Sequence, residues 1–151
     1  MKFSLSVFVF FVFSWIASAQ SGPGVQQFYQ EKGVAMKGYD PVAYFTEKKA
    51  TAGDPVFTYE WAGALWRFIS KDNLEAFKKQ PDKYAPQYGG YCAYGVSENH
   101  KSPTDPNAWT VIDGKLYLNY NLKVKELWSA DIPGRIQKAD FNWKSLEKDN
   151  H

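Results

Sequence analysis

Two pairs of short apolar runs stand out along the chain, each pair separated by a turn that contains glycine. The first pair occupies residues 56–61 and 65–69, and the second pair occupies residues 109–112 and 115–119. Aromatic and β-branched residues favour extended strands, and the Asp113-Gly114 pair between two such runs is a strong hairpin signal. The pattern therefore predicts two β-hairpins.

Between and after the hairpins, apolar residues recur three or four positions apart, which is typical of amphipathic helices. We expect helices over 71–80, 121–130 and 135–146. Ser70 is a good N-cap for the first of these, and Pro133-Gly134 is expected to separate the other two.

The remaining segments are short or polar. A short helix is expected over 25–32, and a helix that starts after a double glycine is possible over 91–97. Polar stretches rich in proline and glycine predict loops over 46–55, 82–88 and 99–107. No repeat or second-domain boundary is visible, so we expect a single α+β domain with two β-hairpins and several short helices.

The first nineteen residues have the pattern of a secretory signal peptide. Lys2 precedes the apolar run 3–16, and Ala17-Ser18-Ala19 matches the small-x-small cleavage signal. The apolar run is shorter than the roughly 20 residues needed to cross a bilayer as a helix. We therefore expect a signal peptide over 1–19, a leader over 20–33 and a mature protein that is periplasmic or secreted, with no stable membrane span.

Charge and cysteine content narrow the class of protein. The 18 basic and 16 acidic residues are interspersed, and nucleic-acid binding needs a clustered basic face, so no nucleic-acid partner is expected. The chain has one cysteine, so no internal disulfide can form, and 18% of its residues are aromatic. Large aromatic side chains are therefore expected to stabilise the domain.

Several stretches resemble the YHS domain family. They are Asp40-Pro41-Val42-Ala43, residues 59–70, residues 73–77 and Pro81-Asp82-Lys83-Tyr84. This resemblance covers roughly residues 37–85, and the remainder is similar to an exported subgroup described only as YHS-domain proteins. It implies a treble-clef-like core within a YHS-like domain over 34–147, whose last part is a helical extension. In its metal-binding form, such a domain holds the metal with cysteines.

Three positions depart from that metal-binding form. The resemblance places cysteines at positions where this chain has Ala43, Ile69 and, at or near the third, Asn73. A thiolate site needs three or four such ligands. We therefore expect the inherited metal site to be absent and a hydrophobic core to replace it.

Cys92, the only cysteine, lies outside those positions and has three interpretations. It can be a buried apolar residue, since free cysteine is often buried. Its thiolate can bind a soft metal such as copper(I), or a haem iron, with His100 as a second ligand. It can also be a redox thiol, if a helix that begins near residue 91 lowers its pKa.

Residues near Cys92 are candidates for contact with the same ligand. They are Tyr88, Gly89, Gly90, Tyr91 and Tyr94. Glycine allows the close approach of a ligand or simply forms a turn, and tyrosine can stack on a flat ligand, ligate ferric iron or pack in the core. A loop position such as that of His100 also fits an exposed side chain without a ligand.

No catalytic motif is recognisable. Asp40 and Asp105 both precede proline, which is usual in turns, and no serine lies in a nucleophile-elbow pattern. The sequence favours an exported non-catalytic binding domain, with a metal ion or metal complex near Cys92. The alternatives are a structural or protein-interaction domain with a decayed metal site, and a thiol-dependent redox protein.

Overall fold

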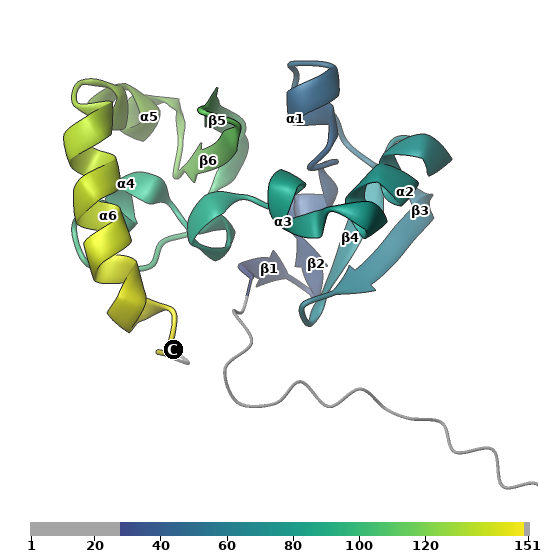
Figure 1. The fold of residues 1–151 in the computed structure, drawn as a ribbon, viewed down its shortest axis with the longest axis horizontal. Helices are drawn as coiled ribbons and strands as arrows, with labels where there is room; N and C mark the ends of the chain where they lie inside the picture. Colours follow the sequence, from purple (N-terminus) through teal and green to yellow (C-terminus); the bar gives the residue numbers. More distant parts are fainter. Residues whose placement is uncertain (1–27, 150–151) are drawn as a thin grey trace, which may run out of the picture.

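The computed structural model describes residues 28–149 as a mixed α+β domain with a four-stranded sheet and a two-stranded sheet. Figure 1 shows the larger sheet and α2 at one end of the long axis, and α4, α5 and α6 at the other end. Within 28–149, no helix is long and apolar enough to cross a membrane. The predicted signal peptide lies outside the described residues.

The larger sheet is built around the first predicted hairpin, which is confirmed. Strands β3 (Asp54–Trp61) and β4 (Ala64–Phe68) pair antiparallel across a turn at Ala62 and Gly63. Both turn residues have positive φ, a conformation that glycine adopts at little cost. β2 (Val34–Ala35) joins β4 in parallel, and β1 (Gln30–Glu31) pairs antiparallel with β2, so the sheet order is β1-β2-β4-β3.

Short helices follow the strands of this sheet. The confirmed helix α2 (Lys71–Lys79) starts at Ser70, whose side chain accepts a hydrogen bond from the Asn73 backbone N–H at 3.2 Å. The other helices of this part are η1 (Met36–Gly38), α1 (Ala43–Thr46) and α3 (Pro81–Tyr84).

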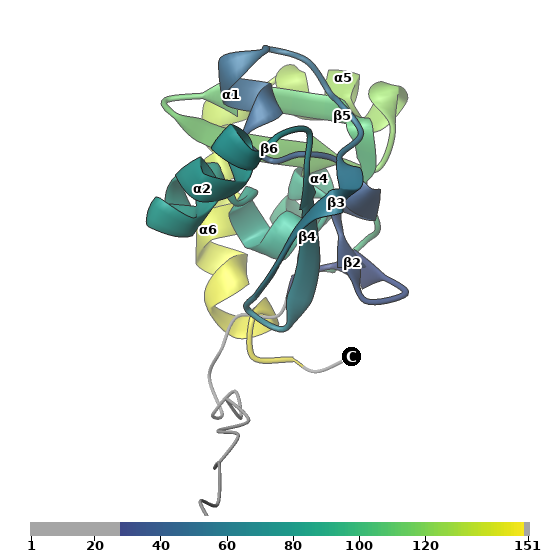
Figure 2. The ribbon, with the colours of Figure 1, turned by 90° about the vertical axis from the view of Figure 1, so that its right-hand side faces the viewer.

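The second predicted hairpin is also confirmed. Strands β5 (Asp105–Ile112) and β6 (Lys115–Asn119) pair across the Asp113-Gly114 turn and lie side by side in Figure 2. The helices of this part are η2 (Gln87–Gly90), α4 (Ala93–Ser97), α5 (Leu122–Ser129) and α6 (Ile132–Leu146).

β6 lies between two hydrophobic cores and contributes to both. Leu116 and Leu118 pack in the first core with Trp66, Phe68 and other residues of the larger sheet. Tyr117, between them in the sequence, packs in the second core with residues of α4, α5 and α6. Successive side chains of a strand point to opposite faces, so this one strand joins the two cores into a single domain.

Four predictions for local structure are wrong at least in part. The helix expected over 25–32 is not formed in its described part, where Gln30–Glu31 is a strand. α6 begins at Ile132, before Pro133-Gly134, and not at residue 135 as expected. Asp131 caps the helix by accepting a hydrogen bond from the Gly134 N–H, and proline is tolerated in a first helical turn. The loop expected over 82–88 contains parts of α3 and η2, and the loop expected over 99–107 contains the start of β5.

Candidate functional site

The Asp40 carboxylate is a buried centre at which three separate chain segments meet. The side chain is fully buried. Oδ1 accepts hydrogen bonds from the backbone N–H groups of Val42 at 2.7 Å and Ala43 at 3.2 Å. Oδ2 accepts from the Ile69 backbone N–H at 2.8 Å and from the Asn73 side-chain amide at 2.8 Å. A carboxylate has about four lone-pair sites, and four donors occupy them here.

The hairpin and α2 do contain the expected hydrophobic core, but the three positions at which the resemblance places cysteines meet at a polar centre beside it. Ala43, Ile69 and Asn73 do come together, but around a carboxylate that binds two of them through backbone N–H groups. Their meeting point is therefore polar. Sequence reasoning assigned Asp40 to an ordinary turn before proline. The one signal of its larger role was Asn73 in α2, whose side-chain amide can donate a hydrogen bond to a carboxylate.

Cys92 is buried and occupies the N-cap position of α4. Its side chain is 1% exposed. The sulfur accepts a hydrogen bond from the Gly95 backbone N–H at 3.4 Å, and its thiol donates to Asn119 Oδ1 at 3.6 Å. The same Asn119 oxygen accepts the Tyr94 N–H at 3.1 Å. The thiol thus takes the place of the usual serine or aspartate cap, linking α4 to the end of β6.

The surroundings of Cys92 disfavour thiol chemistry. Burial raises the pKa of the thiol above its ordinary value of 9.0, and the N–H groups of Gly95, Tyr120 and Tyr94 lower it by less. A reactive cysteine needs a lowered pKa and access for its reaction partner. A buried, protonated thiol has neither.

We expect thiol reagents to modify Cys92 at least about 100-fold more slowly in the folded protein than in denaturant, because labelling must await an opening of the fold. The measurement is the rate of reaction with a chromogenic disulfide reagent. The control is Ser129→Cys in a Cys92→Ala background, since Ser129 is exposed at the end of α5. Equal rates at the two positions would contradict the burial of Cys92.

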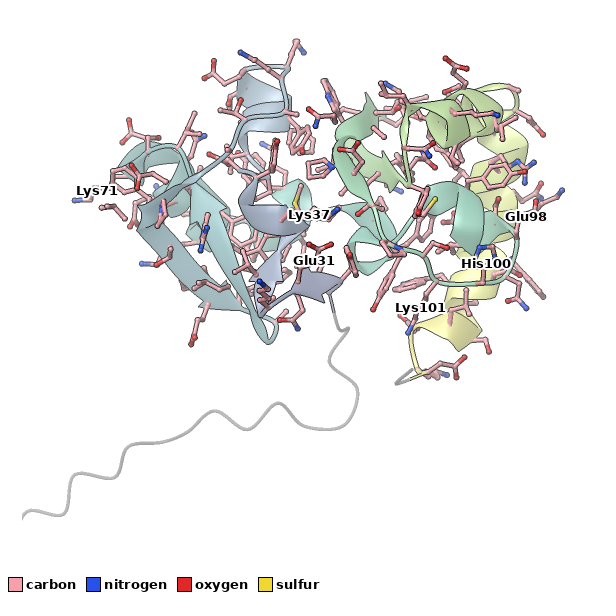
Figure 3. The ribbon with its side chains drawn as sticks, turned by 180° about the vertical axis from the view of Figure 1, so that it is seen from behind. Glu31, Lys37, Lys71, Glu98, His100 and Lys101 are labelled. Atoms are coloured by element: carbon pink, nitrogen blue, oxygen red, sulfur yellow. The ribbon has the colours of Figure 1, made fainter. Side chains whose placement is uncertain are left out.

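His100 lies on the loop after α4 and is exposed. Figure 3 places it on the loop beside α6, with Lys101 further along toward the last turn of α6. Its backbone N–H binds the Gly95 carbonyl at 3.0 Å, and its Nε2 atom packs against Gly95. The Cys92 sulfur has Gly95 and Asn119 as its hydrogen-bond partners, so the structure gives no contact that pairs His100 with the thiol.

The tyrosines around Cys92 point to different places. The guanidinium carbon of Arg135 lies over the ring of Tyr94, 4.2 Å from the centroid of that ring. The ring of Tyr91 lies 5.5 Å from that of Tyr29. Tyr88 is buried, and its hydroxyl donates to Asp140 Oδ1 on α6 at 2.9 Å. Tyr88 and Tyr91 both pack against the ring of Trp143, whereas Tyr94 packs against Arg135, so the three rings do not surround one point.

The double glycine serves the turn in η2. Gly89 and Gly90 have φ of 59° and 76°, and Tyr88 before them also has positive φ. Left-handed conformations at successive positions favour residues without a Cβ atom. A Cβ on Gly90 would also come within 3.2 Å of the Pro86 ring. This geometry accounts for the glycines by backbone conformation.

A pocket of about 440 Å³ lies between the segment 82–88 and one face of α6. We call it the α3–α6 pocket, and its lining residues are Phe28, Asp82, Ala85, Pro86, Gln87, Tyr88, Asp140, Trp143 and Glu147. Tyr88 is the one predicted site residue that lines it. Sequence reasoning missed Asp140 and Glu147. The signal that could have found them is their spacing of three and four residues from Trp143, which places acidic and aromatic side chains on one helix face.

Neither metal-ligand geometry nor likeness to known proteins assigns a function. Within residues 28–149, no group of three or more histidine, cysteine, aspartate or glutamate side chains could hold a metal ion. Comparison of the chain with family models, with curated proteins and with solved structures gives no match.

Proposed function

We propose that this chain is a non-catalytic binding domain and that its ligand occupies the α3–α6 pocket. The observation that carries the proposal is the pocket itself. Its volume of about 440 Å³ lies in the range typical of small-molecule sites, as do those of two other hollows, of about 610 Å³ beside α2 and about 560 Å³ beside α6. The α3–α6 pocket differs from these two in being lined by three separate segments of the chain. Its walls come from the start of the described chain, from 82–88 and from α6, so the site exists only when these distant segments have packed together.

The placement of Tyr88 supports a preformed site. The ring packs in the second core at 5.9 Å from Tyr117 and 6.0 Å from Trp143, measured between ring centroids. Its hydroxyl holds Asp140 on the neighbouring helix. A wall whose side chains are fixed by packing and hydrogen bonds loses little freedom when a ligand binds.

For the scaffold, we infer an exported YHS-type domain. The resemblance requires that the three positions named above lie close together in space, although they are up to 30 residues apart in sequence. They all bind the Asp40 carboxylate, as such a relationship would require. In this proposal, a carboxylate centre stands where the metal-binding form has its thiolate cluster.

A copper or haem site at Cys92 is the weaker proposal. A thiolate ligand must be deprotonated, and burial opposes that here. The sulfur is also enclosed, with one side facing Gly95 and another facing Asn119. A ligand near Cys92 would have to displace these contacts, whereas the α3–α6 pocket is already open.

The test is an NMR titration of the mature protein with a panel of small organic cations, anions and neutral compounds, together with copper(I) and haem. We expect saturable shifts at residues 82–88 and 140–147. Gln87→Trp, which places a large ring in the pocket wall, should abolish them, and Gln137→Trp on the exposed side of α6 should not.

Two results would overturn the proposal. One is saturable binding whose shifts centre on residues 92–95. The other is the absence of saturable binding for every compound of the panel, which would favour a structural or protein-interaction domain. Thermal unfolding of both tryptophan variants shows whether each is folded before it is titrated.

A further inference from the structure

Negative charge gathers on the walls of the α3–α6 pocket. Three of its lining residues, Asp82, Asp140 and Glu147, carry carboxyl groups, and no lysine, arginine or histidine lines it. The chain as a whole has a net charge of +2, so the charge of the pocket lining is opposite in sign to the net charge of the chain. Among the residues that the structure describes, none of the three carboxylates takes part in an ion pair.

The helical repeat explains this arrangement on α6. Asp140, Trp143 and Glu147 are spaced by three and four residues, and Glu147, the C-cap residue just after α6, keeps helical backbone angles, so the three lie on one face. Asp82 is in the first turn of α3, on the opposite wall. A ligand in the pocket is therefore near carboxylates of two different elements, with an indole ring between the two on α6.

Tyr88 fixes one of the carboxylates. Its hydroxyl donates to Asp140 Oδ1. Burial raises the pKa of this phenol, and the hydrogen bond to Asp140 adds to the increase, so the proton stays on Tyr88 at neutral pH. One oxygen of Asp140 is thus held by a neutral donor, and the other oxygen remains available to a ligand.

The carboxylates are not arranged for a bare metal ion. Calcium or magnesium binding requires several oxygen ligands at about 2–2.6 Å from one point. The three carboxylates do not form such a group in the part of the chain that the structure describes. Charge spread over a pocket of about 440 Å³ suits a larger cation instead.

Aromatic side chains complete the match to an organic cation. Trp143 is half-buried and lines the pocket between Asp140 and Glu147. Tryptophan is the best ring for cation–π contact. The Lys101 ammonium lies 5.9 Å from the centroid of this ring, although Lys101 does not line the pocket. Lys101 is therefore a positive charge just outside the pocket that opposes a cationic ligand, and the three carboxylates have to outweigh it.

We propose that the α3–α6 pocket binds an organic ammonium ion, with its charged nitrogen between the carboxylates and its carbon body against Trp143. This inference rests on the proposed function, and it specifies the chemical class of the ligand. Anions are disfavoured by the three carboxylates, and neutral compounds gain nothing from them.

The test uses three probes with the same carbon body and different charge: 3-phenylpropylamine, 3-phenylpropanol and 3-phenylpropanoate. Affinities for the mature protein are measured by calorimetry and NMR. We expect the amine to bind at least about 10-fold more tightly than the alcohol, and the acid not to bind. Raising the salt concentration from about 0.05 to 0.5 M should weaken amine binding, since screening acts on exposed charges.

Charge-removing variants locate the effect. Asp82→Asn and Glu147→Gln should each weaken amine binding about 5-fold, and the double variant about 20-fold. Asp140→Asn keeps an oxygen that can accept the hydrogen bond from the Tyr88 hydroxyl, and it should also weaken amine binding about 5-fold. The control is Asp113→Asn in the β5–β6 turn, away from the pocket, which should leave amine affinity unchanged.

The possible outcomes separate this inference from the proposed function. Equal binding of the alcohol in the pocket, or amine binding that ignores the three substitutions, overturns the cation inference and leaves the binding domain standing. Displacement of the amine by calcium chloride at matched ionic strength also overturns it in favour of a metal site. If the amine, the alcohol, the acid and the wider panel all fail to bind, both proposals are wrong.

Discussion

We expect Asp40→Ala to lower the free energy of unfolding by about 4 kcal/mol, because it leaves several buried N–H groups without acceptors. The backbone N–H groups of Val42, Ala43 and Ile69 and the Asn73 amide all lose their partner. Asp40→Asn should be nearly as damaging, since its NH₂ group would face donors rather than acceptors. Urea unfolding of each variant measures the change.

Asp54→Ala is the matched control for this experiment. Asp54 also precedes proline and also accepts the backbone N–H of the residue two positions on, at 2.8 Å, but it is exposed. We expect its removal to cost less than about 1 kcal/mol, because water can satisfy the freed N–H. Similar losses for Asp40→Ala and Asp54→Ala would show that Asp40 is only a turn residue.

The second large effect is a loss of stability in alkali. Burial raises the pKa values of Tyr44 and Tyr88 well above the ordinary value of 10.0. The unfolded chain loses these phenol protons first, so their contribution is present in full below pH 10 and is lost as the pH rises further. We expect these two phenols to contribute a fall of about 5 kcal/mol between pH 10 and 12, at about 1.4 kcal/mol per pH unit for each tyrosine.

Both phenols are also hydrogen-bond donors in the folded protein. Tyr44 binds the Pro106 carbonyl at 2.8 Å, and Tyr88 binds Asp140. Tyr44→Phe should therefore lose about 1 kcal/mol at neutral pH while reducing the alkaline slope by about 1.4 kcal/mol per pH unit. The measurement is chemical unfolding at a series of pH values.

Tyr120→Phe is the control for the alkaline experiment, since Tyr120 is 52% exposed. Comparison of Tyr44→Phe and Tyr88→Phe with this variant separates the loss of a buried phenol from the loss of an exposed one. An unchanged slope in both Tyr44→Phe and Tyr88→Phe would contradict the role assigned to the buried phenols.

Much of the fold could be predicted from local pattern. The two hairpins and α2 follow from strand-forming runs, turn glycines and a serine cap, all of which act within a few residues. The predicted start of α6 is wrong because Pro133-Gly134 does not break the helix. Proline lacks only an N–H that a first helical turn does not use, and Asp131 supplies the cap for Gly134.

The candidate sites could be predicted only in part. Tyr88 was among the expected ligand contacts and does line the pocket, but Cys92 does not line it. Asp140 and Trp143 become site residues because α6 packs against 82–88, a contact between distant segments. Local sequence pattern carries no record of that packing.

The Asp40 centre has a consequence for the conditions in which this part of the fold can survive. A thiolate–metal cluster in the same place would make folding depend on ion supply and on protection from oxidation. Oxygen acceptors and nitrogen donors belonging to the chain itself cannot be stripped by a chelator or altered by peroxide. This cross-link between 40–43 and the end of β4 is complete as soon as the chain folds.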